Sequence, residues 1–93
     1  MAHATISHLC LLIRTLNYVV PTHAAEEIED DDFSLLDLEN IILTGKIFAR
    51  QRAARIREVK YLISGRTLDG ASAEAVVKLG FSGKLIIITV YRV

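Results

Sequence analysis

Three residues of this 93-residue chain carry side chains that could bind or cut a phosphodiester: His23, Arg66 and Tyr91. An imidazole titrates near neutral pH and can move a proton as general acid or base. A guanidinium can bind a phosphate through two parallel hydrogen bonds, and a phenol can donate or relay a proton. Each side chain alone is ordinary, and a histidine after a proline also occurs on surfaces or bonded to a helix end. The chemistry therefore depends on whether the fold brings the three together.

A second group of candidates is the basic segment between residues 50 and 57, which could contact phosphates. As a strand it would place Arg50 and Arg52 on one face, and as a helical turn it would bring Arg52 and Arg55 together. The alternative is that these arginines are solvated or pair with acidic residues elsewhere. No aromatic residue is interleaved, so a stacking platform for single strands is not supported. The candidate RNA-binding residues are Arg50, Arg52, Arg55 and Arg57.

No motif indicates a metal or another cofactor. The chain lacks HExxH, paired CxxC, EF-hand, phosphate-loop and GxSxG patterns, and the run Asp30 to Asp32 is typical of a solvated acidic turn. The single cysteine, Cys10, cannot form an internal disulfide. It is best interpreted as a small buried hydrophobic residue of a protein in a reducing compartment, which predicts a cytoplasmic location. We expect no metal site and no cofactor.

The composition indicates one domain that spans residues 1–93. Hydrophobic residues make up 52% of the chain, so either the core is dense or apolar surface meets a partner. No apolar run approaches the roughly 18–20 residues that cross a bilayer. The apolar stretch at residues 9–13 is closed by Arg14 without a cleavage site, so we predict neither a signal peptide nor a membrane partner.

The net charge of zero conceals two segments of opposite sign. Residues 26–39 hold eight acids and no Lys or Arg, whereas residues 46–66 hold seven bases opposed only by Glu58. The charge pattern is therefore dipolar along the sequence, although no bulk field draws the chain to nucleic acid.

The first half of the chain has helical periodicity. A helix is predicted from Ile6 to Leu16, capped by Thr5 or Ser7, and a short β-prone segment at residues 18–20 ends at Pro21. Thr22 is expected to cap a second, short helix. A third begins after Ser34, where Ser34 and Asp37 resemble a capping box, and Gly45 occupies the place of a C-terminal cap.

After Gly45 the period changes to alternation, which predicts strands. A turn or loop is expected over residues 65–72 and a hairpin turn at Ser82–Gly83. The last strand is apolar on both faces, as expected of a central strand covered twice. Because helices precede strands, the fold class is α+β: N-terminal helices packed on an antiparallel sheet of about four strands. The expected strands cover residues 46–50, 58–64, 73–81 and 84–93.

The chain resembles the bacterial domain-of-unknown-function family numbered 4258, over residues 18–91. The segments that carry the resemblance are His23-Ala24, 43–47 (LTGKI), 61–67 (YLISGRT), Asp69-Gly70 and 83–91 (GKLIIITVY). That family is similar to RelE-like and BrnT-like toxins of bacterial toxin–antitoxin modules. The resemblance implies helices on a curved sheet, metal-independent RNA cleavage, RNA as substrate and an antitoxin protein as partner.

The resemblance also implies roles for the three dispersed residues. His23 would be the general base or acid, Arg66 would stabilise phosphate charge, and Tyr91 would position or relay a proton. The chain departs from the family at three positions where an arginine, a second arginine and a histidine are usual. These positions hold Glu27, Asp31 and Glu74. The nuclease would therefore be altered or degenerate.

Two further hypotheses stay open. The high hydrophobic content and the last strand suggest a non-catalytic protein-interaction module or a homo-oligomer, such as a homodimer. The arginines between residues 50 and 57 suggest a nucleic-acid binder without catalysis, whose affinity would fall steeply with salt.

Overall fold

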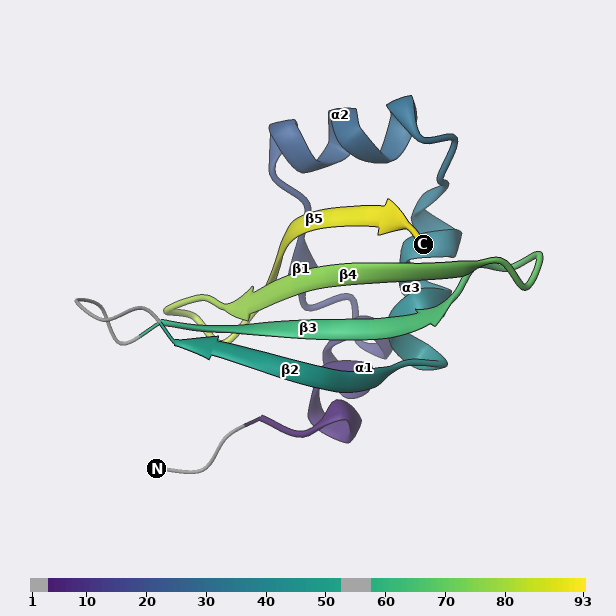
Figure 1. Cartoon of the computed structure of the whole chain (residues 1–93). Helices are drawn as coiled ribbons and strands as arrows, with labels where there is room; N and C mark the ends of the chain where they lie inside the picture. Colours follow the sequence, from purple (N-terminus) through teal and green to yellow (C-terminus); the bar gives the residue numbers. More distant parts are fainter. Residues whose placement is uncertain (1–3, 53–57) are drawn as a thin grey trace.

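The computed structural model describes residues 4–52 and 58–93, which form three helices and a five-stranded sheet (Figure 1). The fold class is α+β, as predicted. The elements in chain order are α1 (Ile6–Arg14), β1 (Tyr18–Val19), α2 (Thr22–Asp30), α3 (Leu35–Leu43), β2 (Lys46–Arg52), β3 (Val59–Arg66), β4 (Ser72–Leu79) and β5 (Leu85–Arg92).

The sheet has the strand order β1-β5-β4-β3-β2. Four strands form antiparallel pairs, but β1 pairs with β5 in parallel, with Tyr18 beside Leu85. The sheet is therefore mixed and has five strands, one more than expected. The extra strand arises because the β-prone segment before Pro21 joins the edge of the sheet.

The helices cover only one face of this sheet. Figure 1 shows α1 and α3 behind the strands and α2 alongside β5. Alternate strand residues face the helices and are buried, among them Ile63, Val77 and Ile87. Leu38, Ile41 and Ile42 of α3 meet them in the core, which matches the apolar spacing of that helix. The residues in between point to the opposite side, which we call the uncovered face.

Two glycines let α3 approach the sheet closely. A Cβ at Gly65 would lie 2.0 Å from the Ile41 carbonyl oxygen, and a Cβ at Gly45 would lie 2.5 Å from the same oxygen. Gly45 directly follows the C-cap residue Thr44, at the end of the helix as predicted, but its φ is not positive. Both glycines are needed because backbone packs directly against backbone here.

The helix starts agree with the sequence in two cases of three. Thr5 caps α1 and accepts a hydrogen bond from the His8 amide. The Ser34–Asp37 capping box is present at α3. The prediction for α2 is wrong: Pro21 is the N-cap and makes no side-chain bond, so Thr22 is the first helical residue. Proline fixes φ near the value that a helix start tolerates, which lets it take this place.

The Asp37 carboxylate ties α3 to the β3–β4 turn. It accepts hydrogen bonds from the amides of Ser34 and Leu68, and these bonds hold its pKa below the usual value. The ionised form is thus the form that stabilises the fold. This contribution is present above the unfolded-state pKa of 3.8 and is lost as pH falls through the lower, folded-state pKa.

We expect Asp37→Asn to lower the free energy of unfolding at pH 7 by about 0.5–1 kcal/mol. As pH is lowered below about 4, the free energy of unfolding of this variant should decrease less than that of the wild type. Urea unfolding followed by circular dichroism between pH 2.5 and 7 measures both effects. Asp30→Asn, an exposed carboxylate near the end of α2, is the control. Equal pH profiles for wild type and Asp37→Asn would contradict this account.

Several strands differ from the predictions, and β2 runs to Arg52 and not to residue 50. The expected loop over residues 65–72 is shorter, because β3 runs to Arg66 and β4 begins at Ser72. The strand expected to reach Phe81 ends at Leu79, and Phe81 is exposed in the turn before β5. The prediction that the last strand is covered on both faces is wrong, because β5 is buried on its helix side only and Ile86 and Ile88 are half-buried. The β4–β5 hairpin is present, with Gly83 at a positive φ.

Candidate functional site

The uncovered face carries most of the basic charge of the sheet. The strand registers and the alternation of buried residues assign its members. Its cations are Lys46, Lys60, Arg66 and Lys78. Its acids are Glu74 and Glu58, and Glu58 forms a salt bridge with Lys78 at 3.3 Å. The residues of this face are Lys46, Ala49, Gln51, Lys60, Leu62, Ser64, Arg66, Ser72, Glu74, Val76, Lys78, Ile86, Thr89 and Tyr91.

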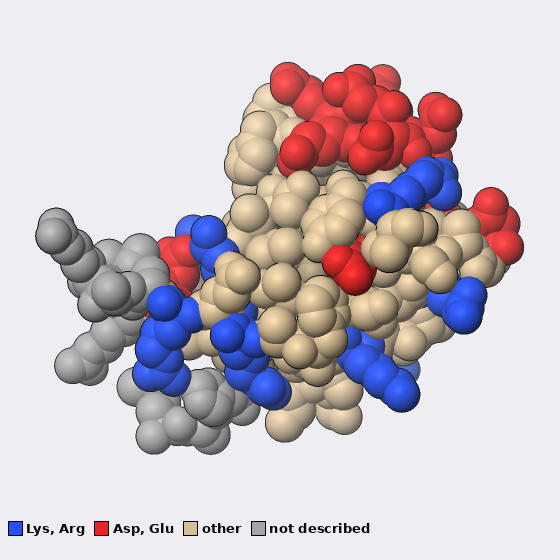
Figure 2. Space-filling view, in the orientation of Figure 1, with Lys and Arg blue, Asp and Glu red and all other residues tan. Residues whose placement is uncertain are grey.

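The structure separates the two signs of charge that the sequence contains. Figure 2 looks onto the uncovered face, with acidic side chains gathered over α2 and basic ones over the strands. A chain with no net charge thus presents a cationic face with an acidic border. Polyanions are attracted to the strands and repelled from α2.

Arg66 is fixed in place by α3 and by the turn that follows it. Its amide donates to the Thr44 hydroxyl, and its carbonyl accepts a bond from the Asn40 amide. Its Nη1 donates to the Gly70 carbonyl oxygen at 2.9 Å. Gly70 has a φ of 87°, a conformation that glycine adopts readily. The guanidinium carries five N–H donors, so it can still bind a phosphate while it holds this contact.

Tyr91 is paired with an acid on the neighbouring strand. Its hydroxyl donates to Glu74 Oε1 at 2.6 Å, and the two residues lie opposite each other in the β4–β5 ladder. This hydrogen bond, together with burial and the charge of Glu74, raises the pKa of Tyr91. The phenol is therefore protonated at neutral pH and acts as a donor.

Arg66, Glu74 and Tyr91 lie at one end of the uncovered face. Arg66 faces Ser72, and Glu74 faces Ser64, so Arg66 and Glu74 are diagonal neighbours about 7–8 Å apart. One strand, β4, lies between Arg66 and Tyr91, which gives roughly 12 Å between their backbones. Two of the three dispersed residues, Arg66 and Tyr91, thus lie on the same end of the same face, with Glu74 on the strand between them.

His23 lies away from Arg66, Glu74 and Tyr91, toward the start of β5. It is exposed in the first turn of α2, one turn before Glu27, whose carboxylate is bonded to Thr89. Arg92 bonds the Asp31 carbonyl at the other end of the helix, so α2 runs in the same direction as β5. His23 is therefore level with about residue 87, roughly 13 Å along the strand from Tyr91.

Two of the predicted RNA-binding arginines, Arg50 and Arg52, do not share the face of Arg66. Arg50 pairs with Tyr61 and Arg52 with Val59, which places both on the helix side of the sheet, exposed on the edge strand β2. Arg50 Cζ is 5.8 Å from the centre of the Tyr61 ring. Arg55 and Arg57 lie outside the described residues. The part played by these four arginines in RNA binding stays a prediction.

Glu74 is the residue that sequence reasoning noticed but did not place in the site. It was recognised only as an acid at a position where the resembled family has a histidine. The signal that could have found its role is the alternation of β4 and β5, which pairs Glu74 with Tyr91. Within residues 4–52 and 58–93, no cluster of three metal-ligating side chains occurs. None of the helices in these ranges has both the length and the apolar character needed to cross a bilayer.

Comparison with known protein families shows the family of this chain. The family model described as Domain of unknown function (DUF4258) matches residues 21–92, which is most of its length. The chain belongs to the DUF4258 family. No curated protein and no solved structure matches it. The DUF4258 match covers α2, α3 and β2 to β5, and therefore includes Arg66, Glu74 and Tyr91.

Proposed function

We propose that this domain binds RNA on the uncovered face of its sheet and cleaves it without a metal, as a toxin-like ribonuclease with an altered site. The observation that carries the proposal is the convergence of Arg66, Glu74 and Tyr91 at one end of a cationic face. The resemblance to RelE-like and BrnT-like toxins supports the same reaction class and an antitoxin partner.

The proposed reaction is the attack of a ribose 2′-oxygen on the adjacent phosphorus. The bond between the 2′-oxygen and phosphorus forms, and the bond between phosphorus and the 5′-oxygen breaks. Glu74 takes the proton of the 2′-hydroxyl, and Tyr91 gives its proton to the leaving 5′-oxygen. Arg66 stabilises the charge that develops on the phosphoryl oxygens. The contact of 2.6 Å between Glu74 and Tyr91 then returns the proton to the phenol.

In this scheme the acid at position 74 replaces the histidine expected there. A carboxylate next to a guanidinium can serve as the base in a metal-free cleavage, because the arginine offsets its repulsion of the phosphate. His23 stays a prediction from the sequence, and its distance from Tyr91 favours Glu74 as the base. Loss of cleavage on His23→Ala, with full cleavage by Glu74→Gln, would reverse this choice.

The purified chain should cut a fluorogenic RNA oligonucleotide in the presence of EDTA and leave a 2′,3′-cyclic phosphate. The same oligonucleotide with 2′-deoxy sugars should remain intact, since it lacks the nucleophile. Arg66→Ala should slow cleavage by about 10²–10³-fold, and the same purification of that variant also controls for contaminating nuclease. Intact RNA at high protein concentration would refute the proposal.

A non-catalytic protein-interaction module or homodimer is the second candidate. It is favoured by β2, which ends the strand order and pairs within the described chain only with β3. Phe48 on this edge strand is 50% exposed. An open edge with an exposed aromatic residue can pair with another chain. Light scattering across a range of concentrations tests it, and a strict monomer would remove the homodimer.

A further inference from the structure

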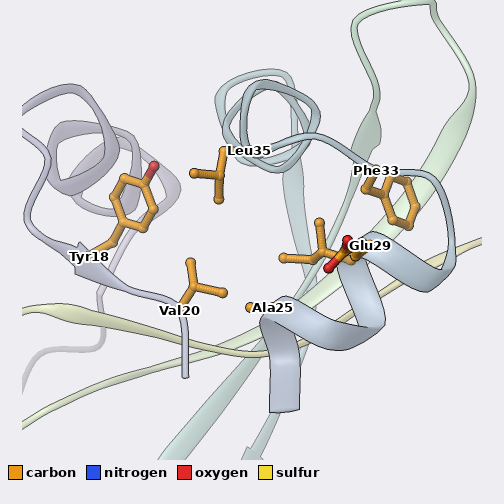
Figure 3. A pocket seen from close by; sticks show the side chains of 7 residues that line it. Tyr18, Val20, Ala25, Glu29, Phe33 and Leu35 are labelled. Carbon is orange, nitrogen blue, oxygen red and sulfur yellow. The ribbon is translucent and has the colours of Figure 1, made fainter. Parts of the chain in front are cut away.

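A groove of about 370 Å³ opens between β1, α2 and the start of α3 (Figure 3). None of its lining residues belongs to the uncovered face, so it is a separate surface. Ile28 contributes to the lining, and six other residues complete it: Tyr18, Val20, Ala25, Glu29, Phe33 and Leu35. Its volume is near the lower end of the range for ligand pockets, about 300–1,000 Å³.

The groove is apolar and continues into exposed apolar surface. Leu35, which lines it, is 54% exposed, and Leu36 beside it is 61% exposed. The first turn of α3 therefore presents leucines to solvent at the rim. A groove that ends in exposed leucines is better suited to an apolar side chain of a larger partner protein than to an enclosed small molecule.

The segment that lines this groove carries acidic residues and no base. All its lining residues fall between positions 18 and 35, and the chain has no Lys or Arg from Thr15 to Gly45. Glu29 lies on the groove wall, and Glu39 accepts a hydrogen bond from Tyr18 at 2.6 Å. The last turn of α2 carries no base, so its negative helix end is not offset within the helix.

One contact within the chain shows how this region receives a cation. Arg92 Cζ lies 4.6 Å from the centre of the Phe33 ring, and Arg92 Nε donates to the Asp31 carbonyl oxygen at 3.3 Å. Phe33 is also a wall of the groove. A guanidinium is thus bound by a groove aromatic ring and by the carbonyl end of α2, which is a cation–π arrangement.

We propose that the groove binds a cationic amphipathic segment of another protein. An apolar side chain of that segment occupies the groove between Ala25, Phe33 and Leu35. Its Lys or Arg residues lie against the carboxylates of α2, which the chain itself leaves without a helix-borne base. Apolar anchoring combined with opposite charge gives both affinity and selection of the partner. This surface does not depend on the RNA proposal.

The probe is a fluorescein-labelled amphipathic peptide of about 12 residues, built from Leu and Lys at helical spacing. We expect saturable binding by fluorescence anisotropy, weakened by added salt. A Leu/Glu peptide of the same pattern should not bind, and a scrambled Leu/Lys peptide without an apolar face should bind at least about tenfold more weakly. Equal binding of the scrambled peptide would overturn the proposal.

Variants separate groove binding from attraction to an acidic helix. Ala25 is exposed, so Ala25→Phe should fill the groove without unfolding the domain and should weaken the Leu/Lys peptide about tenfold. Leu35→Ser should also weaken peptide binding, because it removes an apolar side chain from the groove. Leu68→Ser changes a leucine that is 60% exposed but lies outside the groove, so it should leave peptide binding unchanged. Glu29→Lys should weaken binding more than Glu26→Lys, although both change the net charge equally.

Two further results would overturn the proposal. Unchanged peptide binding by Ala25→Phe, with equal losses in Glu29→Lys and Glu26→Lys, would mean non-specific attraction to α2. A dimer that Ala25→Phe dissociates would mean that a second copy of the chain is the occupant. Because Arg66→Ala removes the proposed RNA chemistry but not the groove, it should bind the peptide normally, which distinguishes failure of one proposal from failure of the other.

Discussion

Glu74→Gln should reduce metal-free RNA cleavage by about 10²–10⁴-fold, the usual contribution of a general base. Glutamine keeps the size of the side chain and can still accept the Tyr91 hydrogen bond, so the fold should remain intact. RNA affinity should not fall, since the substitution removes a negative charge from the uncovered face. Single-turnover cleavage and equilibrium binding of uncleavable RNA measure the two quantities separately.

A second tyrosine–glutamate pair supplies the control for Glu74→Gln. Tyr18 donates to Glu39 at 2.6 Å, the same distance as in the Tyr91–Glu74 pair, but this contact lies on the helix side of the molecule. Burial and Glu39 raise the pKa of Tyr18 to about 12. Glu39→Gln should leave cleavage unchanged. If both variants lose activity equally, the effect is structural and Glu74 is not the base.

Gly65→Ala should destabilise the domain by about 3 kcal/mol or more, the upper range for an overpacked core. The added Cβ would lie 2.0 Å from the oxygen and 2.8 Å from the carbonyl carbon of Ile41, so α3 would have to move away from β3. A domain of this size has only about 5–15 kcal/mol of total stability. Urea unfolding gives the change directly, and hydrogen exchange should show α3 losing protection first.

Gly80→Ala is the matched control for Gly65→Ala. Its added Cβ would meet the end of the flexible Ile86 side chain at 2.9 Å, which can rotate, rather than a backbone atom. We expect a change below about 1 kcal/mol. Similar losses of stability for the two variants would contradict the explanation by close approach of α3, since only one of them places an atom against helix backbone.

The sequence predicted the architecture because local patterns govern it. The capping box at Ser34 and the alternation that buries Tyr61 and Ile63 are readable from neighbouring residues. β1 is harder to predict from the sequence, because a two-residue strand is defined by its pairing with β5, where Tyr18 lies beside Leu85, and not by its own residue pattern. The order of helices and strands then fixed the fold class.

The site was less predictable because strand irregularities decide which face a side chain occupies. A bulge between Ile47 and Ala49 shifts the alternation of β2, so Arg50 and Arg52 point to the helix side and not to the face of Arg66. A second bulge, between Val76 and Val77, separates the two halves of the β4–β5 ladder. No residue pattern in the sequence marks either bulge.

The position of His23 relative to β5 depends on contacts between residues that are distant in the sequence. The direction of α2 follows from Pro21, from the parallel pairing of β1 and from the Arg92–Asp31 contact. Residue types alone suggested that an imidazole, a guanidinium and a phenol could meet. The structure brings the guanidinium and the phenol to one end of the uncovered face, with a carboxylate beside them.

The most direct test of the proposed site is an NMR titration of the ¹⁵N-labelled chain with an RNA oligonucleotide that carries 2′-O-methyl groups and cannot be cut. The account predicts that the amides of Arg66, Glu74 and Tyr91 shift most, followed by Lys60 and Lys78 on the same face. Shifts confined to α2 around His23, or to the β2 edge around Arg50 and Arg52, would contradict it.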